Sequence, residues 1–320
     1  MRPFSLLLIA TTAWASSWSA TPSALSATHG AREHPVVAKL SVVATTPDLA
    51  SIASAIGGDA VEVKALAKPT EDPHFVDAKP SHVVTLNRAD VLVEGGADLE
   101  IGWLPPLLEN ARNSKIAIGA PGRIVASQGI RMLEVPSTLD RARGDVHAKG
   151  NPHFLIDPIN VKIIAATIAD HLTQVSPASA ATFKANLVTF TAALDAHYAA
   201  WQQQLAPFSG AKIVTYHKDF VYLAERFNLN VVETLEAKPG IAPSPAHIAQ
   251  VIAVMRANNA HVILVQPFQN RKTAETVAGQ TDALVLDIPQ QPGAIKDTNS
   301  YLQLMDYMVS SIATALKAKR

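Results

Sequence analysis

The sequence contains no cysteine in its 320 residues. Disulfide bonds and thiolate metal ligands are therefore excluded, as is lipid attachment through an N-terminal cysteine. An excess of either charge is also absent, because 27 lysines and arginines balance 27 acidic residues. Zero net charge offers no basic groove for a nucleic acid and no polybasic patch for a membrane surface. We therefore expect a protein that binds no nucleic acid.

Long hydrophobic runs are absent beyond the N-terminus. The chain starts with one positive charge, at Arg2, followed by the apolar run 6–10 and then small residues. This layout is typical of a secretory signal peptide, and the run is too short to span a bilayer. We expect residues 1–27 to be a signal peptide and residues 28–38 to be flexible. The mature protein is then expected in the periplasm, without a lipid anchor.

From residue 39 onward, short β-branched runs alternate with helical patterns. The predicted strands lie at 40–46, 61–66, 91–94, 115–118, 213–215, 231–234, 262–265 and 284–286. Strands that alternate with helices in this way form parallel sheets with helices on their faces. The sequence therefore predicts an α/β protein.

Residues 177–205 form a different pattern. Hydrophobic residues recur there at three- and four-residue spacing, without glycine or proline after residue 177. This predicts one helix of about 40 Å, which would act as a rigid strut. The predicted architecture is two α/β lobes with parallel sheets: an N-terminal lobe at 39–176, a linking helix at 177–206 and a C-terminal lobe at 207–320.

Three of the 11 histidines lie on connections that follow predicted strands or precede helices. His74 stands in an Asp-Pro-His-Phe segment, and His153 in a similar Asn-Pro-His-Phe segment within the Gly- and Pro-rich loop 144–158. His217 comes two residues after the strand 213–215. Ligands of open α/β sheets bind beyond the carboxyl ends of the strands, and imidazoles are good zinc ligands. The three histidines are therefore candidate metal ligands in a cleft between the lobes.

Other residues near these positions have more than one interpretation. Asp287 directly follows the strand 284–286, so it is a candidate fourth ligand, although an ordinary turn or cap residue fits that place as well. His217 is also compatible with a helix N-terminal residue that packs on Tyr216. His147, six residues before His153, is compatible with a ligand, a weak capture site or an exposed side chain, and exposure is the favoured interpretation.

Five segments, in order along the chain, resemble the zinc- and manganese-binding solute-binding proteins of bacterial ABC importers. They are Thr45-Thr46-Pro47-Asp48-Leu49, Asp72-Pro73-His74, Asn87-Arg88-Ala89-Asp90 with 95–100, Asn151-Pro152-His153-Phe154-Leu155-Ile156-Asp157-Pro158, and Val214-Thr215-Tyr216-His217-Lys218-Asp219-Phe220. The resemblance implies two lobes joined by one long helix, with a single metal ion between them.

The resemblance also assigns ligands. It places the first ligand at His74, the second at His153 and the third at His217, a position that is histidine in zinc members and commonly glutamate in manganese members. Asp287 is the nearest match to the acidic fourth ligand of some members. Many zinc members have a long His- and Asp-rich loop before the second ligand. Here residues 141–150 contain only His147 and Asp145 from that set, which gives little basis for loop-based metal loading.

The expected function is capture of Zn²⁺ in the periplasm and its delivery to the membrane permease of an ABC importer. Zn²⁺ is then the transported substrate, and the protein is not an enzyme. Three nitrogen ligands and one oxygen ligand favour zinc over manganese. We expect a monomer, and a periplasmic metallochaperone is a further candidate partner.

Three alternatives are weighed against this interpretation. A manganese carrier is disfavoured by His217, and an adhesin-like surface role is disfavoured by the lack of an anchoring cysteine. A three-histidine zinc hydrolase belongs to another class, and the chain has no His-Glu-x-x-His or Gly-x-Ser-x-Gly segment.

Overall fold

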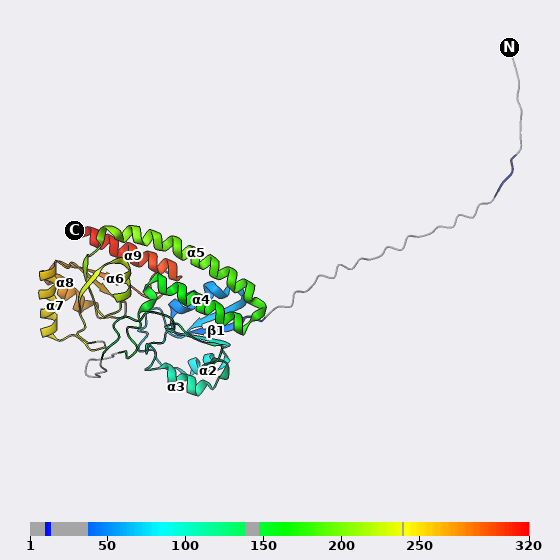
Figure 1. Ribbon diagram of the computed structural model, residues 1–320, viewed down its shortest axis with the longest axis horizontal. Helices are drawn as coiled ribbons and strands as arrows, with labels where there is room; N and C mark the ends of the chain where they lie inside the picture. The colour runs from blue at the N-terminus through cyan, green and yellow to red at the C-terminus, as the bar shows by residue number, and fades with distance from the viewer. Residues whose placement is uncertain (1–9, 14–37, 138–146, 239, 320) are drawn as a thin grey trace, which may run out of the picture. The chain divides into compact units, whose positions relative to one another are not determined.

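The computed structural model in Figure 1 describes residues 10–13, 38–137, 147–238 and 240–319. The predicted signal peptide and the flexible segment after it lie almost entirely outside these residues, as does Asp145. Within the described residues, none of the helices combines the length and hydrophobicity that a bilayer crossing requires. Residues Ala38–Arg320 form one compact unit.

The first lobe is built on a four-stranded parallel sheet in the order β2-β1-β3-β4. Its strands are β1 (Leu40–Ala44), β2 (Val61–Ala65), β3 (Val91–Glu94) and β4 (Arg123–Val125). One face is covered by α1 (Pro47–Gly57) and α4 (Pro158–Val175), and the other by α2 (Pro80–Arg88) and α3 (Leu104–Ala111). Both faces are therefore buried, which accounts for the continuous apolar run of β3.

The second lobe repeats this topology with the order β6-β5-β7-β8, again parallel. Its strands are β5 (Lys212–Thr215), β6 (Asn230–Thr234), β7 (Val262–Val265) and β8 (Leu284–Asp287). The helices α7 (Pro245–Asn258) and α8 (Arg271–Thr281) cover one face, and α6 (Val221–Phe227) and α9 (Tyr301–Ala318) pack on the other. The prediction of two α/β lobes with parallel sheets is confirmed.

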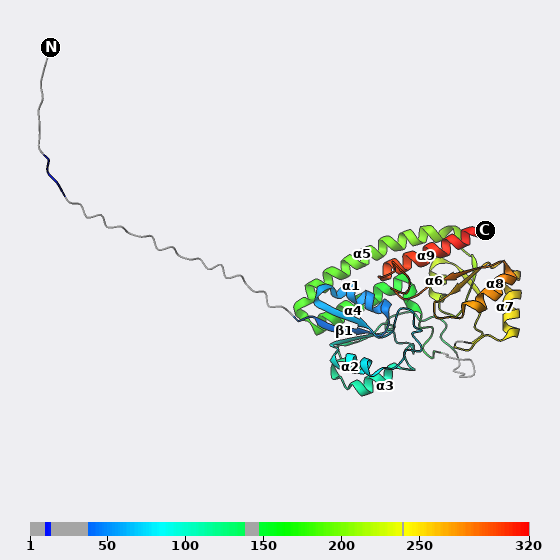
Figure 2. The ribbon, with the colours of Figure 1, turned by 180° about the vertical axis from the view of Figure 1, so that it is seen from behind.

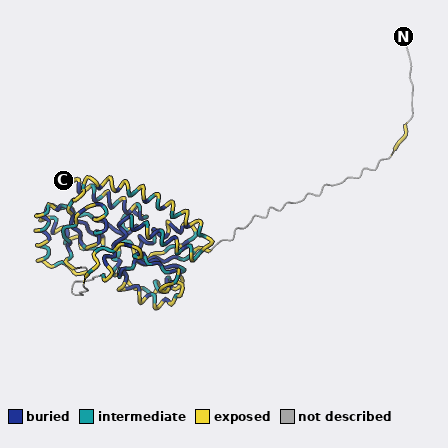
Figure 3. Tube along the Cα trace, in the orientation of Figure 1, coloured by how far each residue is buried: buried dark blue, intermediate teal, exposed yellow. Residues whose placement is uncertain are grey.

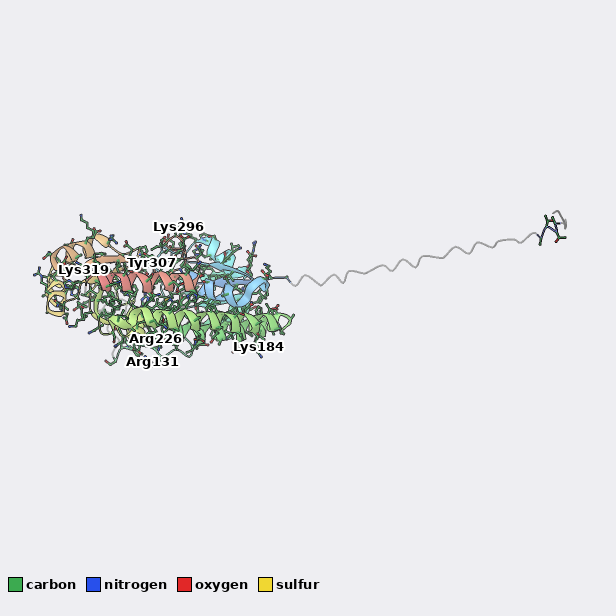
Figure 4. All side chains as sticks on the ribbon, turned by 90° about the horizontal axis from the view of Figure 1, so that it is seen from above. Arg131, Lys184, Arg226, Lys296, Tyr307 and Lys319 are labelled. Atoms are coloured by element: carbon green, nitrogen blue, oxygen red, sulfur yellow. The ribbon has the colours of Figure 1, made fainter. Side chains whose placement is uncertain are left out.

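The long helix α5 (Ala180–Leu205) begins after a single 3₁₀ turn, Pro177–Ser179. It packs on α1 and α4 of the first lobe and on α9 of the second. Figures 1 and 2 show α5 running along both lobes, and Figure 4 shows α9 beside it from above. The buried side of α5 carries Phe183, Leu194 and Trp201, while its outer side is exposed (Figure 3). Trp201 fastens the two helices, because its Nε1–H donates to Oδ1 of Asp306 at 2.7 Å.

A single hydrophobic core connects the lobes. It takes in residues of β1 and β3 from the first sheet, residues of β5 and β7 from the second, and the buried sides of α1, α4, α5, α6 and α9. Separate smaller cores lie under α2 and α3 and under α7 and α8. Because the main core is continuous, rotating one lobe against the other would expose apolar surface, which costs about 25 cal/mol per Å².

Two local predictions differ from the structure. The strand expected at 115–118 is wrong: Ser114–Ile116 is a 3₁₀ turn, and Ile118 is 89% exposed. The edge strand is β4 instead, which follows Gly122, where an added Cβ would lie 2.4 Å from the carbonyl oxygen of Asp90. The helix α3 is absent from the prediction, and its sequence can start Leu-Pro-Pro because proline is tolerated in the first helical turn. Further 3₁₀ turns among the described residues are Gly58–Ala60, Phe154–Ile156 and Ala206–Phe208.

Candidate metal centre

The three histidines expected as ligands lie together between the two lobes. Each offers one nitrogen atom, and these atoms all lie within 4.8 Å of one another. The ring centroids of His74 and His153 are 5.1 Å apart, and those of His74 and His217 are 5.6 Å apart. His153 and His217 are 5.3 Å apart by the same measure. Three separate connections therefore converge on one point, two from the first lobe and one from the second.

Two of the rings are oriented by carboxylates. Nδ1 of His74 lies 2.8 Å from Oδ1 of Asp72, and Nδ1 of His217 lies 2.9 Å from Oε2 of Glu236. Because a carboxylate only accepts, each Nδ1 carries a proton, and in the neutral ring Nε2 keeps a free lone pair. Nε2 of His74 and Nε2 of His153 are buried without a hydrogen-bond partner. Imidazoles that bind metals in proteins have this arrangement, with the second nitrogen donating to an acceptor.

The connections that carry the histidines are held by side-chain hydrogen bonds. Asn151 accepts a hydrogen bond from the backbone N–H of His153 at 3.0 Å, and its Nδ2 donates to the carbonyl oxygen of Lys218 at 2.7 Å. This side chain thus ties the His153 loop to the residue after His217. On the His74 loop, Nε1–H of Trp103 donates to the carbonyl oxygen of Pro73 at 2.9 Å. The sequence segments that flank the ligands therefore also position them.

Burial and neighbouring charges set the protonation of the site. Burial and the adjacent histidines lower the pKa of His153 well below its ordinary value, so this ring is neutral. Burial alone would lower the pKa of His217, but its hydrogen bond to Glu236 and the charges of Asp219 and Glu236 raise it. A cation that binds here displaces a proton from His217 when the pH is below that raised pKa.

A cavity of about 300 Å³ reaches the three histidines. Phe75, which is 61% exposed, lines this cavity next to His74, and Gln266, Gln269 and Asn270 line it from the second lobe. The histidines are thus accessible through a path that has both polar and apolar walls.

Asp287 does not join the histidines. It is the last residue of β8, its side chain is 49% exposed, and its carboxylate pairs with Arg271 at the start of α8. The strand order gives the reason, because β7 lies between β8 and β5, the strand that leads to His217. Asp287 thus ends the edge strand, and its carboxylate is held in the ion pair with Arg271, outside the group of three histidines.

His147 was interpreted as exposed, and this interpretation is wrong. Its ring centroid lies 5.2 Å from that of His74, and its Nε2 is buried without a hydrogen-bond partner. Burial, with the charges of His74 and His217, lowers the pKa of His147 to about 4. A sequence signal for this placement was Gly150, whose φ of +102° turns the chain back after His147.

Comparison with known proteins identifies a family whose sequence pattern matches this chain. The family described as zinc-uptake complex component A, periplasmic, matches residues 42–315. The manganese ABC transporter substrate-binding lipoprotein PsaA of Streptococcus pneumoniae is 24% identical over 288 residues, covering 87% of this chain and 89% of that one. The iron-binding protein YfeA of Yersinia pestis is 25% identical over 280 residues, covering 86% of each.

Solved structures have the same architecture. A crystal structure of a ZnuA deletion mutant with zinc bound is similar to this chain with a TM-score of 0.72 and 26% identity, covering 87% of this chain and 98% of that one. Members of the matching family are transport components and not enzymes, so the hydrolase alternative is set aside. The family match covers most of the folded chain, in agreement with the shared two-lobe fold. The chain therefore belongs to the family of zinc-uptake component A proteins, the periplasmic metal-binding components of ABC importers.

Proposed function

We propose that this protein captures Zn²⁺ outside the cytoplasm and delivers it to the permease of an ABC importer. The observation that carries this proposal is the composition of the cluster: three imidazoles and, among the described residues, no carboxylate at the same spacing. Zinc accepts imidazole nitrogen readily, whereas manganese prefers oxygen ligands. The related ZnuA structure with zinc bound supports the same choice, although the relatives also include proteins named for manganese and iron.

In this proposal His74, His153 and His217 bind the ion through Nε2. At the usual Zn–N distance of about 2.0–2.1 Å, neighbouring ligand atoms in a tetrahedron lie about 3.3 Å apart. The nitrogens here lie within 4.8 Å of one another, so binding would bring the rings closer together by at most about 1.5 Å. Asp72 and Glu236 hold the two outer rings during this movement and make them more basic.

Release to the permease would then involve small shifts of the loops that carry the histidines. The continuous core under α5 and α9 opposes a wide hinge motion, because such a motion would separate packed apolar side chains. His217 lies directly on a short connection after β5, and its partner Glu236 follows β6. A movement of these two connections is sufficient to withdraw one ligand from the ion.

A competition titration tests the proposal. The protein is stripped with a chelator and titrated with Zn²⁺, Mn²⁺ and Fe²⁺ against an indicator of known affinity. We expect one tightly bound Zn²⁺ per chain, much weaker Mn²⁺, and a large loss of zinc affinity in His217→Ala. The control His171→Ala changes a histidine that hydrogen-bonds to the carbonyl oxygen of Pro121, away from the cluster, and should bind normally.

Two results would overturn the proposal. Tighter binding of Mn²⁺ or Fe²⁺ than of Zn²⁺ would identify another cargo. Binding of all three ions no tighter than micromolar would show that the cluster is not a capture site. His217→Glu provides a further check, because an added carboxylate should improve Mn²⁺ binding relative to Zn²⁺.

A further inference from the structure

We propose that His147 provides the fourth ligand, so that the cargo ion is held by four imidazoles. This inference rests on the proposed function, because it completes the same site. His147 takes the place of Asp287, whose carboxylate pairs with Arg271, although the sequence alone favoured exposure of His147 over a role as a ligand.

The cluster contains several buried nitrogen atoms without hydrogen-bond partners. Among the described residues, five buried side-chain nitrogen or oxygen atoms have no hydrogen-bond partner, and three of them are Nε2 of His74, His147 and His153. An unpartnered buried polar atom is destabilising, so each such atom requires an explanation. The ring of His147 lies against that of His74, with 5.2 Å between centroids and 31° between the planes. One cation bound between the rings of His74, His147 and His153 would provide a partner for all three Nε2 atoms.

The other ring nitrogen of His147 has a hydrogen-bond partner. The ring of His147 hydrogen-bonds to the backbone of Asp98, which leaves Nε2 as the nitrogen with the free lone pair. His74 and His217 show the same division, with Nδ1 bonded to a carboxylate. A fixed tautomer with an outer-shell acceptor is the usual arrangement of a metal-binding histidine. An exposed loop histidine would need no such partner.

A tight turn from His147 to Gly150 positions the ring of His147. The backbone N–H of Gly150 donates to the carbonyl oxygen of His147 at 3.1 Å, and Nζ of Lys149 lies 3.7 Å from Oδ1 of Asp98. The positive φ of Gly150 is combined with a close approach, because an added Cβ would lie 2.9 Å from the carbonyl oxygen of Leu133. The turn is thus folded back onto the first lobe beside the histidine cluster. Its movement toward the cluster is required, because His147 lies outside the 4.8 Å group.

The chemical consequence is selectivity. Four neutral nitrogen donors suit Zn²⁺ and disfavour Mn²⁺, Mg²⁺ and Ca²⁺, which prefer oxygen. The site would then be closed, with no position for a reactive water. The competing candidate is Asp219, whose Oδ1 is also buried without a partner and whose other oxygen lies against Gln266. That residue would give three nitrogens and one oxygen.

The test compares ligand sets by spectroscopy and affinity. Zinc-edge X-ray absorption of the zinc-loaded protein should show four imidazoles, and the Co²⁺-substituted protein should show the visible bands of a tetrahedral nitrogen site. Loss of a residue that only hydrogen-bonds to a metal ligand usually weakens metal binding about 10–100-fold. Because His147 is proposed as a ligand itself, we expect His147→Ala to weaken zinc binding by more than this. The same substitution should change the Co²⁺ spectrum. The matched control is His82→Ala, which removes the other described histidine with an unpartnered buried nitrogen, Nδ1. It should change neither measurement.

The outcomes separate this inference from the proposed function. If the unchanged protein binds no zinc, the proposed function fails. If it binds zinc tightly while His147→Ala has the same affinity and the same Co²⁺ spectrum, only the fourth ligand is wrong. The assignment of His147 would also be overturned if the spectrum of the unchanged protein shows one oxygen donor and the spectrum of Asp219→Asn does not. Equal melting temperatures of the metal-free proteins would show that the variants are folded.

Discussion

The carboxylate behind His217 gives a direct test of how the site obtains its affinity. Oε2 of Glu236 lies 2.9 Å from Nδ1 of His217, and the two side chains are only 16% and 12% exposed. Glu236→Gln keeps the size of the side chain and an oxygen that accepts from Nδ1–H, but it removes the negative charge. Loss of such an outer-shell partner typically weakens metal binding about 10–100-fold, or about 1.4–2.7 kcal/mol. Because the pair is largely buried, solvent screens it little.

The assay is competition with a chromophoric chelator for Zn²⁺ across a range of pH. In the unchanged protein, zinc affinity should fall as the pH decreases through the raised pKa of His217, because protonation competes with the metal. In Glu236→Gln that pKa should be lower, so the fall should begin at lower pH while the affinity at high pH is reduced. The control Glu233→Gln changes a nearby carboxylate on β6, the strand that precedes Glu236; this carboxylate accepts from the backbone N–H of Thr234. The reasoning is refuted if Glu236→Gln binds zinc within about twofold of the unchanged protein, or if Glu233→Gln loses as much.

Substitutions elsewhere in the protein should separate the site from its scaffold. Asp287→Ala should leave zinc affinity unchanged in the same competition assay, because its carboxylate pairs with Arg271 instead of joining the cluster; a loss as large as that of His217→Ala would contradict this placement. Burial raises the pKa of Glu100 from 4.5 to about 7, so its contribution to the stability of the metal-free protein should decline by about 3 kcal/mol as the pH rises through this range. Urea unfolding at several pH values should show this decline, and Glu100→Gln should remove it; an unchanged pH dependence in the variant would refute the assignment. Leu194→Ala on the buried side of α5 should lower the free energy of unfolding by about 2–5 kcal/mol, whereas Val188→Ala on its exposed side should change it by less than about 0.5 kcal/mol. Equal effects of the two substitutions in thermal melts would show that α5 does not contribute to a shared core.

Much of the fold was predictable because its signals are local. Short β-branched runs and helical periodicity occur within windows of a few residues. His153 and His217 lie within two residues of an element boundary, and His74 lies on the connection between β2 and α2. Parallel strands place their carboxyl ends at one edge of a sheet, so these histidines were expected to converge. The approach of their three nitrogens to within 4.8 Å of one another agrees with that expectation.

The errors concern information that local sequence does not contain. Asp287 lies at the carboxyl end of its strand, but strand order, which depends on the whole sheet, puts β8 at the edge. The edge strand β4 has three residues, and its position depends on the close approach of Gly122 to Asp90. His147 lies near His74 because the turn at Gly150 packs against the first lobe, a tertiary contact that no periodicity records.

The most direct test of the central claim is a crystal structure of the zinc-loaded protein with anomalous diffraction measured at the zinc edge. We predict one strong anomalous peak per chain, with Nε2 of His74, His153 and His217 each at about 2.0–2.1 Å from it. A peak at another place in the protein, or zinc-loaded crystals in which these three histidines contact no metal, would contradict the account.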